Sequence, residues 1–191
     1  MVNAALAAFG HNGYKKASIA DIAASAGVSK AMIFYWFGCK RNLYAYLVEL
    51  CGNQLLAEVA GRLDKQETDF FDRLCAATEI KMAALRQHPA MLDFLKWMYN
   101  ESDPEVADVT GGVRRMAKEF SGSFALDNID MHKFKDSADP ALTLRFILWA
   151  SEGFIRDASA TRADLDAYVG EFFRCMEMLK RNLYQEKYSS N

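Results

Sequence analysis

The sequence has little of what would mark a β-rich, secreted or membrane-spanning protein. It has only three prolines in 191 residues, and no stretch alternates apolar and polar residues as a half-buried strand does. No apolar run reaches the ~18–20 residues that cross a membrane, and the amino terminus lacks a signal-peptide pattern. We therefore expect an all-α protein of the cytoplasm that does not contact a membrane.

Patterns typical of catalysis and metal binding are also missing. The four cysteines have no paired spacing, and the three histidines are scattered along the chain. The sequence contains no G-x-S-x-G, no G-x-G-x-x-G after a strand, no G-x-x-x-x-G-K-[ST] and no H-E-x-x-H. We expect a protein that is not an enzyme and that holds neither a metal nor a cofactor.

The charge is divided unevenly along the chain. The net charge is −2, but residues 1–50 carry five lysines and arginines against two carboxylates, a net charge of +3. The remainder carries 18 basic against 23 acidic side chains, a net charge of −5. This division predicts a basic amino-terminal end that can face DNA and an acidic body that would not.

The most informative stretch is residues 18–43, SIADIAASAGVSKAMIFYWFGCKRNL. Ser18, three residues before Asp21, is typical of a residue that caps a helix amino terminus, and Ser29 is placed to cap a second helix. Gly27 between them supplies the backbone freedom for a sharp turn. Two short helices joined by such a turn are the geometry of a helix-turn-helix, whose second helix enters the DNA major groove.

The second of these helices has two distinguishable faces. At about 100° per residue, Ile33 and Phe37 share the inward face, and Tyr35 points away from it toward DNA. Trp36 lies about 60° from Ile33, so we expect it in the core. A longer helix then begins at Lys40, and its free N–H groups and positive dipole end suit a phosphate.

The run AGVSKAMIFYWF followed by Lys40 resembles the pattern AGVSKGTLYHYF-x-x-K of TetR-family transcriptional regulators, and the resemblance extends from about Val2 to Leu50. It implies a three-helix DNA-binding domain at residues 1–48 and a helical ligand-binding and dimerisation domain at residues 49–191. By this resemblance, the DNA contacts fall on Ser18, Lys30, Ala31, Met32, Tyr35 and Lys40. Ser29 and Phe34, in the same segment, complete the predicted DNA-binding surface.

The sequence departs from the family pattern at three places. Phe34 replaces a tyrosine whose hydroxyl reaches a phosphate, and Cys39 replaces the usual helix cap. The chain opens MVNAALAAF without the basic residues that commonly come before the first helix, and a shortened start would weaken DNA binding without changing the fold. Two alternatives follow: a ligand-binding or interaction module without DNA binding, or a redox-responsive regulator that uses Cys39.

Beyond residue 50 the sequence is helical almost throughout. Asp103-Pro104 and Asp139-Pro140 each place a capping acid before a proline at the first helical position. We expect Gly111-Gly112 to bend or interrupt the helix that contains them, since each glycine costs about 1 kcal/mol relative to alanine. Residues 125–139 are predicted to be a loop. The predicted helices cover residues 40–61, 68–87, 90–100, 104–124, 140–158 and 162–186.

The last two predicted helices each have a broad apolar face with steps of three and four residues. One mutual contact would not use both faces, so we expect a homodimer in which two copies form a four-helix bundle. Ordinary packing within one chain is the alternative. The predicted dimer contacts are Phe146, Trp149, Tyr168, Phe172, Phe173 and Met176.

The region from 68 to 124 is rich in methionine and aromatic residues, which suit an adaptable apolar pocket. Plain core is the more frequent role of any single one of them, but the resemblance implies a cavity for a small-molecule inducer here. We expect an apolar or amphipathic molecule to bind and release the protein, as a repressor, from double-stranded operator DNA. The predicted ligand residues are Phe70, Leu74, Glu79, Met82, Phe94, Trp97, Met98, Met116, Phe120 and Glu152.

Overall fold

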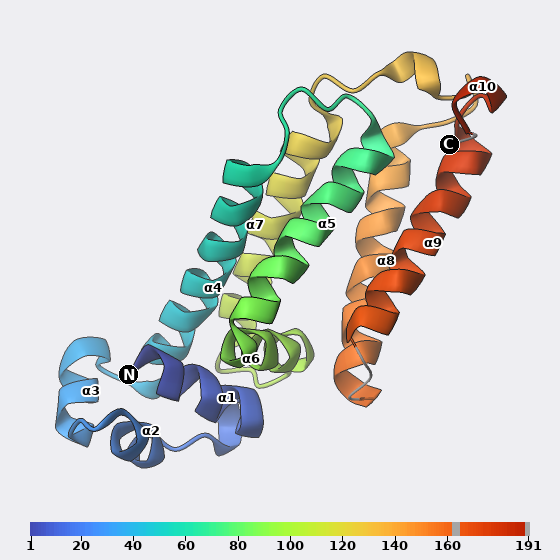
Figure 1. Cartoon of the computed structure of the whole chain (residues 1–191). Helices are drawn as coiled ribbons and strands as arrows, with labels where there is room; N and C mark the ends of the chain where they lie inside the picture. The colour runs from blue at the N-terminus through green and yellow to red at the C-terminus, as the bar shows by residue number, and fades with distance from the viewer. Residues whose placement is uncertain (162–164, 190–191) are drawn as a thin grey trace. The chain divides into compact units, whose positions relative to one another are not determined.

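The computed structural model describes residues 1–161 and 165–189, and in these ranges the chain is built from helices, which confirms the predicted fold class (Figure 1). None of these helices combines the length and the hydropathy needed to span a bilayer. The helices are α1 (Val2–Lys16), α2 (Ile19–Ala26), α3 (Lys30–Phe37), α4 (Lys40–Arg62), α5 (Phe70–Gln87), α6 (Pro89–Asn100), α7 (Ala107–Leu126), the 3₁₀ turn η1 (Met131–Lys133), α8 (Pro140–Thr161), α9 (Leu165–Leu183) and α10 (Glu186–Ser189).

The chain forms two compact units, each with its own core. Unit 1 comprises Met1–Ala57 and Ala83–Ala117, and unit 2 comprises Glu58–Met82 and the described part of Lys118–Asn191. Unit 1 therefore contains α1, α2, α3 and α6 complete, together with the first parts of α4 and α7 and the last part of α5. Because α4, α5 and α7 each contribute to both units, no single point of the sequence separates the two.

Unit 1 is organised around aromatic rings from α1, α4 and α6. The ring centroid of Tyr44 lies 5.2 Å from that of Phe9 and 5.4 Å from that of Phe94, both in edge-on arrangements. Helix α6 reaches α1 this closely because Gly10 has no side chain: a Cβ there would lie 2.9 Å from the backbone nitrogen of Phe94. In Figure 1, α6 accordingly lies beside α1. Helix α6 is thus part of the packing that supports the amino-terminal helices.

Glycines inside two helices do not end them. Asn12-Gly13, a pair that is typical of a helix end, does not end α1: Gly13 kinks the helix with φ of 69°, and it resumes as far as Lys16. A second contact with the end of α6 lies next to the kink: the backbone N–H of Tyr14 donates to a carboxylate oxygen of Glu101 at 2.9 Å. A glycine that suits an isolated turn can therefore serve as a bend inside a packed helix.

Gly111 and Gly112, expected to bend or interrupt their helix, do not interrupt it: α7 is one continuous helix. Packing within unit 1 outweighs the intrinsic cost of the two glycines. Val113 fits against Gly52 of α4, where a Cβ would lie 2.7 Å from its Cγ2. Arg114 donates from Nη2 to the carbonyl oxygen of Tyr99 at 2.8 Å, which holds α7 to the end of α6.

Unit 2 has a second aromatic core. The ring of Tyr184 lies 4.8 Å from that of Phe134 and 5.2 Å from that of Phe71, both edge-on. Helices α8 and α9 run antiparallel and side by side in Figure 1, and both contribute apolar residues to this core. The buried residues of this core are Phe70, Phe71, Leu74, Ala125, Phe134, Leu144, Ile147, Met176 and Tyr184.

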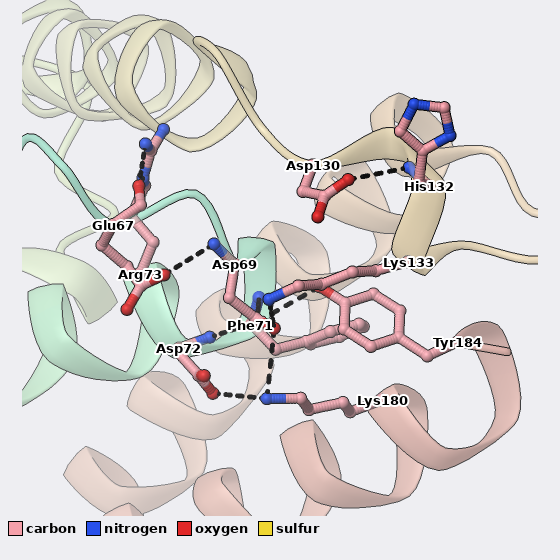
Figure 2. A network of polar contacts seen from close by, with 10 residues as sticks. All are labelled: Glu67, Asp69, Phe71, Asp72, Arg73, Asp130, His132, Lys133, Lys180 and Tyr184. Carbon is pink, nitrogen blue, oxygen red and sulfur yellow. Dashed lines mark hydrogen bonds and ion pairs between the residues drawn. The ribbon is translucent and has the colours of Figure 1, made fainter. Parts of the chain in front are cut away.

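A buried carboxylate ties three distant segments of unit 2 together (Figure 2). Asp69 caps α5 by accepting from the backbone N–H of Asp72 at 3.1 Å, and it also accepts from the Tyr184 hydroxyl at 3.1 Å. The ammonium groups of Lys133 and Lys180 lie 2.9 and 3.3 Å from its other oxygen. Burial by itself would raise the pKa of Asp69, but these hydrogen bonds and charges outweigh it and lower the pKa. The site is fully satisfied and structural.

Candidate nucleic-acid interface

Helices α2 and α3 form the predicted helix-turn-helix. The Ser18 hydroxyl accepts from the backbone N–H of Asp21 at 3.4 Å, and the Ser29 hydroxyl accepts from the backbone N–H of Met32 at 3.2 Å. Between them Gly27 takes the left-handed conformation, with φ of 66° and ψ of 27°. Both serine hydroxyls keep their own proton for another acceptor, so capping does not exclude a contact with a phosphate.

Most of α3 faces outward. Among its eight residues only Ile33 is buried, and Phe37 is half-buried. Tyr35 is 85% exposed, and Trp36, expected in the core, is 50% exposed. The expectation for Trp36 was wrong because a helix of two turns buries only a narrow face. A side chain 60° from the centre of that face lies at its edge and stays partly in water. The remaining exposed residues of α3 are Lys30, Ala31, Met32 and Phe34.

Two lysines on this surface are positioned by aromatic rings. The ammonium of Lys30 lies 5.6 Å from the ring centroid of Phe34, on the same exposed helix. The ammonium of Lys40 lies 4.7 Å from the ring centroid of Tyr14 and donates to the carbonyl oxygen of Lys15 at 3.1 Å. It thus satisfies a free carbonyl at the end of α1 and still has hydrogens to donate. Both contacts restrain the ammonium groups before any DNA arrives.

Arg41, next to Lys40, has a different role. Its Nε donates to the carbonyl oxygen of Glu105 at 2.9 Å, and its Nη2 lies 2.5 Å from a carboxylate oxygen of Asp108. These contacts hold the first turn of α4 to the start of α7. Sequence reasoning placed Arg41 only among the basic residues of the amino-terminal end, because its partners are more than 60 residues away.

The predicted ligand residues are divided between the units. Phe94 packs on Phe9 and Tyr44, and the Trp97 ring covers Gly13, at 3.0 Å from the position of a Cβ there. These two aromatic residues therefore join α6 to α1. Met98 and Met116 also lie in unit 1, whereas Phe70, Leu74, Glu79, Met82, Phe120 and Glu152 lie in unit 2.

The unit 2 candidates differ in burial. Phe70 and Leu74 are part of the buried core, and Met82, Phe120 and Glu152 are half-buried. Glu79 is exposed, on the side of α5 opposite its buried face.

The predicted dimer contacts fall into two groups. On α8, Phe146 and Trp149 are 55% and 56% exposed and lie on one side of the helix. On α9, Met176 is buried in the core of its own unit, and Phe172 and Phe173 are half-buried. The side chain of Tyr168 lies outside the described residues.

The cysteines differ in accessibility. Cys39, just before α4, is exposed, whereas burial raises the pKa of the Cys51 thiol to about 12 and, as the main cause, that of Cys75 to about 11. Cys175 is half-buried, so Cys39 is the most exposed of the four thiols. In the described part of the chain, no three histidine, cysteine or acidic side chains gather as metal ligands.

Comparison with known proteins identifies the amino-terminal part. Residues 1–47 match the family profile described as "Bacterial regulatory proteins, tetR family". No curated protein sequence gives a significant match.

Solved structures share the fold along the chain. SmeT, the repressor of the Stenotrophomonas maltophilia multidrug efflux pump SmeDEF, is 18% identical with a TM-score of 0.77, covering 97% of this chain and 89% of its own. The fatty acid degradation regulator FadR from Bacillus halodurans is 17% identical with a TM-score of 0.75, covering 92% and 95%. FadR from Bacillus subtilis, solved with stearoyl-CoA, is 15% identical with a TM-score of 0.72, again covering 92% and 95%. The amino-terminal region with the helix-turn-helix thus matches the tetR family of bacterial regulatory proteins, and the described chain shares the fold of these solved structures.

Proposed function

We propose that this protein is a DNA-binding transcriptional repressor that a small molecule releases from its operator. The observation that carries the proposal is the outward face of α3, a capped helix that buries only Ile33 and leaves Tyr35 85% exposed. A folded domain gains nothing from such an apolar and aromatic face in water, so the face is available for a partner. The +3 charge of residues 1–50 favours a polyanion as that partner.

The exposed residues divide into two proposed roles. Ser18, Ser29 and Lys40 offer donors at helix starts, so we assign them to phosphates. The side chains of α3 would enter the major groove, where apolar and aromatic groups contact thymine methyl groups and polar groups read base edges. These groove residues are Lys30, Ala31, Met32, Phe34 and Tyr35.

We further propose that the protein acts in the cytoplasm as a homodimer. The exposed stripe of Phe146 and Trp149 on α8 supports this, because two large apolar side chains on one helix face are costly to leave in water. Phe172 and Phe173 of α9, with Tyr168, would extend the contact. Met176, which is buried in the core of unit 2, would support the dimer surface by packing under it.

The proposed division by function remains a DNA-binding domain at residues 1–48 and a ligand-binding and dimerisation domain at residues 49–191. The similarity in fold to SmeT, a repressor, and to a FadR solved with stearoyl-CoA supports ligand control. Helix α6 and the start of α7 belong to the same compact unit as α3. A ligand that displaced either helix would therefore also displace the recognition helix.

The spacing between two recognition helices makes such a displacement effective. Half-sites in one face of the groove lie about 34–36 Å apart, so a shift of a few ångströms removes one of two simultaneous contacts. The ligand must bind the released form more tightly than the DNA-bound form, since only differential affinity changes the equilibrium.

A gel-shift titration with a duplex from upstream of the protein's own gene tests the function. We expect saturable binding that competes with unlabelled specific duplex, and loss of binding by the variant Tyr35→Ala at the same concentration. Binding by both proteins with equal affinity would contradict the assignment of α3. Loss of binding after diamide treatment of the wild type but not of Cys39→Ser would favour the redox alternative.

A further inference from the structure

Two polar groups in the interior of unit 1 lack a hydrogen-bond partner among the described residues. The Nε atom of Arg114, on α7, is buried and donates to no acceptor. The side chain of Tyr44, on α4, is 2% exposed, and its hydroxyl forms no hydrogen bond with a described residue. Because an unsatisfied buried donor lowers the stability of a folded protein, such groups are rare and require an explanation.

The guanidinium of Arg114 is held in place by the carboxyl end of α6. Its Nη2 donates to the carbonyl oxygens of Tyr99 and Met98, at 2.8 and 3.4 Å, and its central carbon lies 5.7 Å from the centroid of the Tyr99 ring. No ion pair joins Arg114 to a carboxylate in the described part of the chain. The carbonyls thus fix the planar group in one orientation and leave its full charge without an anionic partner.

The Tyr44 hydroxyl lies in the electric field of this guanidinium. Burial raises the pKa of Tyr44 and the Glu101 carboxylate raises it further, whereas Arg114 opposes both effects. Glu101 is already engaged, because it accepts from the backbone N–H of Tyr14 at 2.9 Å and from those of the two residues that follow Glu101, at 3.0 and 2.9 Å. It satisfies neither Arg114 nor Tyr44, but it limits the negative charge that the place can accept.

The flank of α7 beside Arg114 is open. Gly111 lies one helical turn before Arg114, on the same side of the helix, and a Cβ there would meet no atom within 4 Å. The same is true of Gly112. Arg114 is accordingly half-buried, although its Nε is covered. A small group can therefore approach the guanidinium along this flank.

We infer that Arg114 and Tyr44 together bind the carboxylate of the inducer, which is an organic acid with one negative charge. The Nε–H of Arg114 and the O–H of Tyr44 would donate to the carboxylate oxygens, which supply the acceptors that both groups lack. A second negative charge would be repelled by Glu101. This inference rests on the proposed ligand control and names the chemical class of the ligand.

The site is two aromatic contacts away from the proposed DNA-binding surface. The ring centroids of Tyr44 and Tyr14 lie 5.1 Å apart in an edge-on arrangement, and the ammonium of Lys40 lies 4.7 Å from the Tyr14 ring centroid. These residues and Arg114 all belong to unit 1. A carboxylate that displaced Tyr44, or that drew Arg114 away from the end of α6, would therefore disturb the support of Lys40.

The test uses the full-length protein at about pH 8, where a phosphate monoester carries two charges. Butyrate, octanoate and phenylacetate vary the body of the acid, octanamide is the neutral counterpart of octanoate, and octyl phosphate adds a second charge. Thermal unfolding and calorimetric titration are measured for the wild type, Arg114→Met and Tyr44→Phe. The controls Arg115→Met and Tyr46→Phe remove the same groups from exposed positions of the same two helices.

We expect at least one carboxylate to raise the Tm of the wild type and of both controls. It should bind Arg114→Met about tenfold to a hundredfold more weakly, because a charged donor is lost, and Tyr44→Phe about threefold to tenfold more weakly. Octanamide and octyl phosphate should bind the wild type more weakly than octanoate does.

The melting temperature without ligand separates this role from a structural one. Tyr44→Phe should melt at the wild-type temperature or slightly above it, because its hydroxyl has no hydrogen bond to lose. Arg114→Met should melt lower, because it loses the bonds to the end of α6. If Arg114→Met does not fold, Tyr44→Phe still decides the question, since it removes one oxygen and keeps the ring.

Four results would overturn the inference: a carboxylate that protects the wild type and both site variants equally, a series in which no carboxylate protects the wild type, tighter binding of octyl phosphate than of octanoate, or a Tyr44→Phe variant that melts well below the wild type. Carboxylate binding that depends on both residues but leaves the operator bound would overturn the role as inducer.

The proposed function is judged separately, by operator binding. If octanamide releases the operator and no carboxylate does, ligand control stands and the role of Arg114 and Tyr44 falls. If the protein binds no operator, the proposed function fails whatever Arg114 binds.

Discussion

The salt dependence of DNA binding gives the sharpest test of the interface, and Lys40 is the residue to change. Its ammonium is fixed at the carboxyl end of α1 by the Lys15 carbonyl and the Tyr14 ring, at 3.1 and 4.7 Å. The variant Lys40→Met removes the charge and keeps an unbranched side chain against the ring. The lost hydrogen bond and cation–π contact should cost about 1 kcal/mol of stability, too little to unfold the domain.

The expected change in slope follows from counterion release. Each phosphate that the protein neutralises adds about 0.9 to the magnitude of the negative slope of log affinity against log salt concentration. A dimer loses two such contacts, so the slope should fall by about 1.8. Between about 50 and 200 mM salt, the affinity of the variant should therefore decline about 12-fold less than that of the wild type. A monomer on DNA would show about half the change in slope.

Fluorescence anisotropy with a labelled upstream duplex, at several salt concentrations, measures the slope directly. Lys118→Met, which removes an exposed lysine from α7 in unit 2, is the control and should keep the wild-type slope. Circular dichroism melts of all three proteins establish that the fold is retained. An unchanged slope for Lys40→Met would show that Lys40 does not contact a phosphate, and the reasoning from its position would be refuted.

Three further variants test the other assignments. Tyr35→Ala should change the ranking of operator variants more than the salt slope, because a groove contact discriminates bases by about 1–3 kcal/mol; an equal loss on every duplex would refute this. Phe146→Glu should give monomers in sedimentation velocity, since a charge would enter the proposed seam, and a dimer of wild-type stability would place the interface elsewhere. Asp69→Asn should lower the Tm by roughly 5–15 °C at neutral pH by leaving two lysines without their carboxylate. Because the folded-state pKa of Asp69 is lowered, its contribution is present above about pH 4 and is lost as the pH falls further, so the two melting curves should converge in acid.

The local parts of the fold could be predicted from sequence. The caps at Ser18 and Ser29 and the left-handed turn at Gly27 depend on residues at most a few positions apart, and all three have the expected geometry. The errors at Trp36 and at glycines 111–112 have one physical source. Each depended on how much of a helix its neighbours cover, and periodicity describes the helix but not its neighbours.

The sequence by itself therefore determined the class of the fold, the positions of the helices and the identity of the helix that faces outward, because capping, turn formation and amphipathicity act over one or two turns. Only the tertiary structure decided which charges are used within the protein. Arg41 binds Asp108, and Asp69 joins Lys133 and Lys180, across separations of 64 to 111 residues. Periodicity within a helix does not show such pairs, because only packing between helices brings the partners within contact distance.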